Sequence, residues 1–245
     1  GGGELRQLGE AFNIMSEKLE NLDNARNEFV SNASHELKTP VAELRAMLET
    51  LRDGLVTAPD QVQGYYQSML KETGALEALI RDQMELSRLQ APGFSLTRET
   101  LDLRQAADDA LGSARAMAEK KEVLITASLP DAPVMLEGDH SRLRQMMLIV
   151  LDNALRFTPP GNAVSLRLVP GCLEIADSGP GIPEDSLNLV FDRFYRVPGG
   201  EKGPGSGLGL AIAREIAQRH GMALTARNNT SGGAVFSFKW GKLNG

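Results

Sequence analysis

Two stretches of the chain carry mainly apolar side chains at steps of three and four residues. The first stretch is Val30, Ala33, Leu37, Val41, Leu44, Leu48 and Leu51, and the second is Val62, Tyr66, Met69, Thr73, Leu76, Ile80 and Met84. This spacing places each set on one face of an α-helix. The segment 54–60 between them contains a glycine and a proline, which interrupt helices. The sequence therefore predicts a helical hairpin. Since a hairpin alone cannot cover both faces, it also predicts a dimeric four-helix bundle.

The pattern changes after Ala91-Pro92-Gly93. Helices are expected at 103–120, 141–157 and 208–219, and strands at 123–129, 163–169, 172–176, 223–227 and 234–238. These elements predict an α/β sandwich, with one sheet under a layer of helices. His140 is expected in a polar turn. His220, which precedes a helix-ending glycine, is interpreted as a cation that suits the helix dipole.

Charge and hydropathy exclude some classes of protein. The net charge of −6 leaves no basic surplus to neutralise phosphates, so general binding to nucleic acid is not expected. The longest apolar run, 146–151, is far shorter than the ~18 residues of a membrane span. The chain opens with three glycines and no methionine, which indicates a segment of a longer protein.

The segment 34–40 contains the most reactive-looking side chain, His35. On a helical wheel, His35 and Thr39 lie one turn apart on the side opposite the apolar face. A neutral imidazole nitrogen is a good nucleophile, and the adjacent Glu36 can hold the proton of the other ring nitrogen. Thr39 is placed to orient a water or a phosphoryl oxygen. An ordinary surface histidine would show the same local pattern, so the interpretation depends on residues further along the chain.

One amide side chain, Asn153, and one carboxylate, Asp177, suggest a nucleotide site in the second half of the chain. Asn153 lies in an otherwise apolar helix, where a buried amide needs a partner, and a hydrated Mg²⁺ is one such partner. A locally satisfied amide is the alternative. Asp177 follows the strand 172–176 and precedes Gly179 and Gly181. A carboxylate at that position can accept a hydrogen bond from an adenine amino group, and the glycines allow the backbone to approach the ring.

A second glycine cluster, at Gly205, Gly207 and Gly209, leads into the expected helix 208–219 at its positive end, an arrangement that suits phosphate. The cluster lacks the lysine of a Walker A loop. Upstream, Phe191 and Phe194 are followed by a glycine-rich segment. The two aromatics indicate either anchors for a mobile lid or a helix end that packs on the core, and both interpretations can hold together.

Taken together, these motifs resemble the sensor histidine kinases of two-component signalling over almost the whole chain. The matching boxes are SHELKTP at 34–40, LDNALRFTP at 151–159, DSGPGIP at 177–183, FDRFYRV at 191–197 and GSGLGL at 205–210. Residues 4–13 also resemble the end of a HAMP linker. The resemblance implies an α plus α/β chain: a HAMP end and signalling helix at 1–20, a dimerisation and histidine-phosphotransfer hairpin at 21–92, and a catalytic ATP-binding domain of the GHKL type at 93–245.

The resemblance also implies roles for individual residues. His35 is phosphorylated, Glu36 is its acid/base partner and Thr39 positions water when a regulator is dephosphorylated. Asn153 binds Mg²⁺ and Asp177 binds adenine. The remaining ATP contacts are Arg156, Gly179, Gly181, Arg196, Gly205, Gly207, Leu208 and Gly209. The implied partners are a second copy of the chain and the receiver domain of a response regulator. The implied location is the cytoplasmic portion of a bacterial inner-membrane protein, with the membrane segments missing from this chain.

One position departs from the family pattern, and several activities remain open. The family often carries a second asparagine one turn before Asn153, where this chain has Ile149. The loss of a polar contact there predicts weaker nucleotide binding. The leading hypothesis is an ATP-dependent kinase that modifies its own His35. The alternatives are a net phosphatase, a dimeric scaffold with an inert ATP fold, and an ATPase of the chaperone or topoisomerase kind. The last is disfavoured because it needs no helical histidine box.

Overall fold

The computed structural model describes residues 12, 15–16, 33–198, 205–230 and 232–241. Apart from Phe12, the segment expected to resemble a HAMP end lies outside these residues. The chain divides into two compact units, Gly1–Glu77 and Ala78–Gly245. Within the described residues, no helix is both long and apolar enough to cross a membrane.

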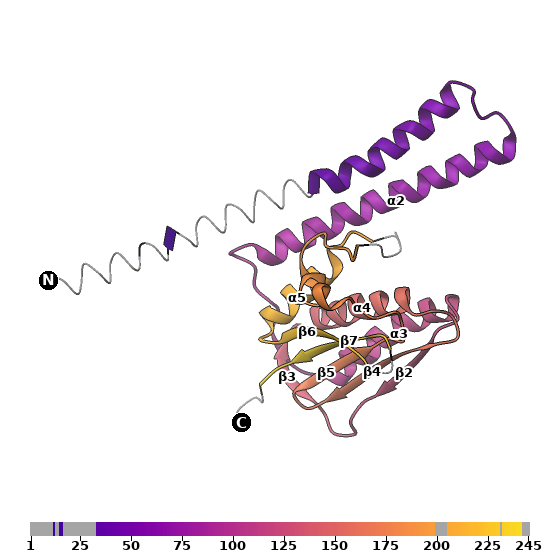
Figure 1. The fold of residues 1–245 in the computed structure, drawn as a ribbon. Coiled ribbons are helices and arrows are strands. Elements are labelled where there is room, and N and C mark those ends of the chain that lie inside the picture. Colours follow the sequence, from indigo (N-terminus) through magenta and orange to yellow (C-terminus); the bar gives the residue numbers. More distant parts are fainter. Residues whose placement is uncertain (1–11, 13–14, 17–32, 199–204, 231, 242–245) are drawn as a thin grey trace. The chain divides into compact units, whose positions relative to one another are not determined.

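The smaller unit contains the predicted hairpin. Residues 33–52 are helical, and the chain reverses through Gly54, whose φ of +68° favours glycine, before α2 (Pro59–Gln90) begins. Figure 1 shows α2 returning beside the first helix. Side chains of the predicted apolar face stay open to solvent in a single chain: Val41, Leu48 and Tyr66 are 52%, 56% and 51% exposed. The prediction of two antiparallel helices is confirmed.

The last part of α2 belongs to the larger unit. Here the helix buries Leu79, Leu86 and Leu89, which are at most 5% exposed. The predicted apolar face includes Ile80 and Met84 on this stretch, but these side chains are 48% and 68% exposed. The end of α2 therefore buries a different helix face from the predicted one.

The larger unit is an α/β sandwich, as predicted. Its sheet has the order β2-β4-β5-β7-β6, with β2 parallel to β4 and the other neighbours antiparallel. The strands are β2 (Leu124–Ser128), β4 (Ala163–Val169), β5 (Cys172–Ala176), β6 (Ala223–Asn228) and β7 (Ala234–Lys239). Three helices lie over one face of the sheet (Figure 1): α3 (Leu103–Lys120), α4 (His140–Phe157) and α5 (Gly209–Arg219). The central helix, α4, contacts both α3 and α5.

Short elements that the sequence did not reveal complete this unit. Strands β1 (Glu99–Asp102) and β3 (Met135–Gly138) pair antiparallel, and two 3₁₀ turns, η1 (Glu184–Ser186) and η2 (Leu189–Phe191), precede the second glycine cluster. Strands of four residues give too little alternation to detect in a sequence.

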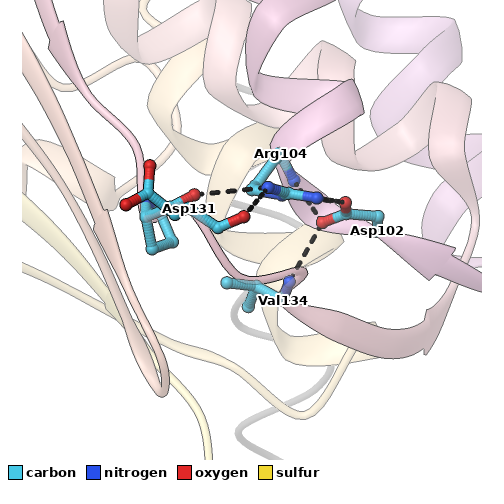
Figure 2. A network of polar contacts seen from close by, with 5 residues as sticks. Asp102, Arg104, Asp131 and Val134 are labelled. Atoms are coloured by element: carbon cyan, nitrogen blue, oxygen red, sulfur yellow. Dashed lines mark hydrogen bonds and ion pairs between the residues drawn. The ribbon is translucent and has the colours of Figure 1, made fainter.

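A polar network fixes the start of α3 (Figure 2). The Asp102 carboxylate caps the helix, accepting hydrogen bonds from the backbone N–H of Arg104 (3.1 Å) and of Val134 (3.0 Å). The Arg104 guanidinium pairs with the same carboxylate and donates to the carbonyl oxygen of Asp131 (2.5 Å). Its hydrogen bond to Asp102 is the main reason why the pKa of that carboxyl is lowered. The network thus attaches the loop between β2 and β3 to α3.

Two histidines differ from their sequence interpretations. His140 does not lie in a turn: it is the first residue of α4, with Nε2 3.4 Å from the Asp109 carboxylate. His220 does follow α5, but its Nε2 accepts a hydrogen bond from the backbone N–H of Asp139 (3.0 Å). Burial lowers its pKa, so its interpretation as a cation at the helix end is wrong.

Candidate active site

His35 lies on the first helix of the smaller unit, where His35 and Thr39 are both exposed, as the helical wheel predicts. The Thr39 hydroxyl donates a hydrogen bond to the backbone carbonyl oxygen of His35 (3.4 Å). Glu36, the residue after His35, is half-buried. An exposed imidazole with a neighbouring carboxylate can react with an electrophile that arrives from solvent.

In the larger unit, the Asp177 carboxylate stands at the end of β5 and is 6% exposed. Its Oδ1 accepts hydrogen bonds from the N–H groups of Gly179 (2.9 Å) and Ala234 (3.1 Å). Burial raises the pKa of this carboxyl and the two hydrogen bonds oppose that rise. Within the described residues, Oδ2 accepts no hydrogen bond. Asp177 is thus a fixed acceptor, with one oxygen left for a ligand N–H.

Glycines surround Asp177 because the backbone segments approach too closely for side chains. A Cβ at Gly179 would lie 2.6 Å from the carbonyl oxygen of Phe157, at the end of α4. At Gly233, in the turn between β6 and β7, it would lie 1.9 Å from the carbonyl oxygen of Asp177. The sequence reasoning missed Gly233, because only the pairing of β7 with β5 brings this turn to Asp177.

Asn228 is a second residue missed from the sequence. It ends β6, and its side-chain amide exchanges two hydrogen bonds with the backbone of Ile182, in the loop that follows Asp177. Gly181 has a φ of +79°, and a Cβ there would lie 2.9 Å from Asn228 Oδ1. Asn228 and Asn229 look like ordinary turn residues in the sequence, so no local signal indicated this contact.

The second glycine cluster lies between two arginines and the start of α5. Arg196 donates a hydrogen bond to the carbonyl oxygen of Gly205, and a Cβ at Gly205 would lie 2.2 Å from Nη1 of Arg156. Burial lowers the pKa of Arg156, and the charge of Arg196 lowers it further while Asp152 opposes the shift. An anion bound beside Gly205 would therefore neutralise two converging positive charges.

The same cluster leads directly into α5. Gly207 has a φ of +69°, and its carbonyl oxygen accepts from the N–H of Phe194 (2.9 Å). The N-cap residue of α5 is Leu208, which is fully buried and makes no side-chain cap. The first N–H groups of α5, beginning at Gly209, are consequently suited to an anion.

The aromatic residues upstream anchor this region to the core. Phe191 is buried and meets the ring of Phe236 edge-on, with centroids 6.1 Å apart. Phe194 is half-buried. Packing of Phe191 on the core is confirmed, whereas most of the glycine-rich segment expected as a lid, 199–204, lies outside the described residues.

One face of α4 lies along this site. Asn153 is half-buried, and one turn earlier Cγ2 of Ile149 lies 3.3 Å from the position of a Cβ on Gly209. No group of three or more His, Cys, Asp or Glu side chains in the described ranges can hold a metal ion. A metal at Asn153 would therefore depend on oxygens of a bound ligand, which is how Mg²⁺ is usually held beside phosphates.

Comparison with known proteins gives consistent matches. Residues 25–92 match the model of the His Kinase A (phospho-acceptor) domain, and residues 138–243 match that of the histidine kinase-, DNA gyrase B- and HSP90-like ATPases. The histidine-protein kinase/phosphatase MprB of Mycobacterium sp. (strain KMS) is 35% identical over 95% of this chain and 46% of its own length. The histidine-protein kinase BaeS of Escherichia coli (strain K12) is 34% identical over 94% and 50%. The chain thus spans about half the length of the curated relatives it matches.

Solved structures agree in fold. The histidine kinase AdeS of Acinetobacter baumannii superposes with a TM-score of 0.66 at 27% identity, over 86% of this chain and 98% of that one. The histidine kinase ThkA, solved in complex with the response regulator protein TrrA, gives a TM-score of 0.70 at 20% identity, over 87% and 60%.

Proposed function

The chain belongs to the sensor histidine kinases of two-component signalling, and we propose that it transfers the γ-phosphoryl group of ATP to its own His35. From there the group passes to an aspartate on the receiver domain of a response regulator. In the first step a lone pair of the His35 imidazole forms the new N–P bond, the bond from phosphorus to the leaving oxygen breaks, and ADP departs. Glu36 takes the proton from the other ring nitrogen.

The nucleotide occupies the larger unit in this proposal. Asp177 Oδ2 accepts from the adenine amino group, and the backbone around Gly179 and Gly181 approaches the ring. The triphosphate lies at the glycine cluster 205–209 before α5, including the buried Leu208, and Arg156 and Arg196 offset its charge. The observation that carries this assignment is the close approach at Gly179, Gly181 and Gly233, where a Cβ would meet backbone or amide atoms at 1.9–2.9 Å.

Mg²⁺ supplies charge neutralisation of the phosphates when bound. Asn153 is the side chain proposed to hold it, together with phosphate oxygens and water. The absence of an acidic cluster among the described residues agrees with such a ligand-dependent site.

The decisive experiment is incubation with γ-labelled ATP and Mg²⁺. The parent chain should acquire acid-labile label, and His35→Gln should acquire none. His140→Gln serves as a control, because His140 starts α4 and contacts Asp109 instead of the proposed site. Equal labelling of the parent and of His35→Gln would refute the assignment.

Regulator dephosphorylation is a second candidate activity. The exposed Thr39 hydroxyl on the same helix face as His35 favours it, and several relatives are named kinase/phosphatase. A single-turnover assay with phosphorylated regulator tests it: Thr39→Ala should lose dephosphorylation and keep labelling of His35.

We also propose the arrangement of the whole protein. Residues 1–20 end a HAMP linker, 21–92 form a homodimeric hairpin and 93–245 form the catalytic domain, in the cytoplasmic portion of a bacterial inner-membrane sensor. The uncovered apolar side chains of the hairpin, including Val41, Leu48 and Tyr66, support dimerisation. The complex of ThkA with TrrA supports a receiver-domain partner.

A further inference from the structure

The glycine cluster before α5 contains one residue with a side chain between its first two glycines, and that side chain is held by α2. The Ser206 hydroxyl donates a hydrogen bond of 2.6 Å to the carboxylate of Asp82. The same hydroxyl accepts a bond of 3.2 Å from the N–H of Leu208, the N-cap residue of α5. Ser206 therefore connects α2 with the start of the helix whose N–H groups face the proposed phosphate position.

The end of α2, from Ala78, belongs to the larger unit and buries several side chains. Leu79, Leu86 and Leu89 are buried at 5%, 1% and 0% exposure, so this part of the helix has a buried apolar face. Asp82 lies between the first two of these leucines along the helix. Its carboxylate is thus presented to Ser206 from a partly buried stretch of helix.

Polar contacts on the same helix hold the neighbouring elements. The Glu85 carboxylate pairs with Arg142 near the start of α4. Gln90 accepts from Arg193 (2.5 Å), in the segment before the glycine cluster, and donates to Glu215 of α5 (3.1 Å). The end of α2 thereby contacts the segment before the glycine cluster, through Arg193, and the cluster itself, through Ser206.

A glycine-rich loop needs such an attachment. Gly205 and Gly207 carry no side chain, and Gly207 adopts a φ of +69°, so the unbound loop has more backbone freedom than most segments. Loop ordering that a ligand would otherwise have to supply reduces its affinity. A charge-assisted hydrogen bond at Ser206 supplies part of that ordering in advance.

We propose that Asp82 is a positioning residue of the nucleotide site. It holds Ser206 so that the backbone of 205–208 keeps the conformation that receives the triphosphate, which makes nucleotide affinity depend on the end of α2. This inference rests on the proposed function in one respect: the glycine cluster must bind nucleotide.

The test measures binding of Mg²⁺ with a non-hydrolysable ATP analogue to the whole chain by calorimetry. Asp82→Ala and Ser206→Ala should each weaken binding about tenfold, equivalent to about 1.4 kcal/mol. The double variant should be no weaker than Ser206→Ala alone, because Asp82 acts only through the Ser206 hydroxyl, which that variant already lacks. Asp82→Asn keeps an acceptor oxygen and should restore binding to within about threefold of the parent.

The control is Glu77→Gln, which removes an equal charge from an exposed position of α2 and should leave affinity unchanged. Autophosphorylation adds a second measurement: Asp82→Ala should raise the KM for ATP and leave the rate at saturating ATP near that of the parent. Parent-like or tighter binding by Asp82→Ala, or additive losses in the double variant, would overturn the inference while leaving the proposed function intact. A parent chain that binds no nucleotide would overturn both. If Asp82→Ala fails to fold, as judged by circular dichroism, the comparison of Ser206→Ala with Asp82→Asn decides the question.

Discussion

Asn228 holds the backbone of Ile182 by two hydrogen bonds, with Oδ1 accepting from its N–H (2.8 Å) and Nδ2 donating to its carbonyl oxygen (2.7 Å). The side-chain amide thus makes the pair of hydrogen bonds that the backbone of a neighbouring strand would make, at the point where β6 ends. It thereby fixes the loop that leaves Asp177, although 46 residues separate the two partners.

Replacing Asn228 by alanine should therefore loosen that loop. Two lost hydrogen bonds predict a loss of about 1–3 kcal/mol in the free energy of unfolding and several-fold weaker nucleotide binding. Chemical denaturation and calorimetry measure the two effects. Asn162→Ala is the matched control, because the side chain of Asn162 is exposed. Unchanged affinity in Asn228→Ala would show that the loop is ordered without this contact.

A methyl group at Gly233 should be far more damaging than one at the preceding glycine. Both residues have positive φ, +87° and +96°, but a Cβ at Gly233 would lie 1.9 Å from the Asp177 carbonyl oxygen, whereas Gly232 has open space. We expect Gly233→Ala to cost more than about 2 kcal/mol and Gly232→Ala about 1 kcal/mol. Thermal and denaturant unfolding compare them. Equal losses would mean that backbone strain alone decides the cost.

His220 should make stability depend on pH. Burial lowers its pKa below the ordinary 6.5, while the carbonyl of Ile216 and the charge of Asp139 oppose the shift and the charge of Arg98 adds to it. Below about pH 6.5 the unfolded chain binds a proton that the folded chain does not. The contribution of neutral His220 to the free energy of unfolding is therefore fully present above pH 6.5. It decreases as pH falls below that value, by at most about 1.4 kcal/mol per pH unit.

His220→Gln keeps one donor and one acceptor but does not titrate, so it should flatten the slope of unfolding free energy below pH 6.5. His140→Gln is the comparison variant and should leave that slope in place. A slope that is identical in the parent and in His220→Gln would assign the pH dependence to other groups.

Ile149→Asn should strengthen binding of Mg-ATP. Position 149 is half-exposed and lies against Gly209 at the start of α5, one helical turn from Asn153, so a second amide there can reach the same ligand. One added hydrogen bond predicts a gain of about 2- to 10-fold, measured by calorimetry. The gain should disappear when EDTA replaces Mg²⁺. An affinity equal to or below that of the parent would count against the prediction that Ile149, in place of the family's asparagine, weakens nucleotide binding.

Leu48→Glu should weaken the proposed homodimer. Leu48 is 56% exposed in one chain and lies on the apolar face expected to meet the second copy. A buried carboxylate in that interface is costly, so sedimentation should show monomer at concentrations where the parent is dimeric. Leu55→Glu, on an exposed leucine of the loop after the first helix, should stay dimeric. A dimer that survives Leu48→Glu would place the interface elsewhere.

The local sequence pattern was enough to predict the main helices and strands of the fold. The α3 prediction matches the structure at both ends, as do those of β4 and β5, because amphipathic periodicity and flanking turn residues act within a single element. The same is true of His35, whose exposure follows from its angle on the helix relative to Leu37. The strands β1 and β3 could not be seen, since four residues each gain their stability from mutual pairing.

By itself the sequence determined the two kinds of architecture, the reactive side chain at His35 and the chemistry of the boxes at Asp177 and 205–209. Only the tertiary structure decided which distant residues hold those boxes in place. Asn228 reaches Ile182 because β6 lies beside β7 and β7 beside β5. Asp82 reaches Ser206 although 124 residues separate them, at the end of α2 where Leu79, Leu86 and Leu89 are buried. Such contacts depend on sheet order and helix packing, which arise from the summed burial of many residues, so no motif of neighbouring letters encodes them.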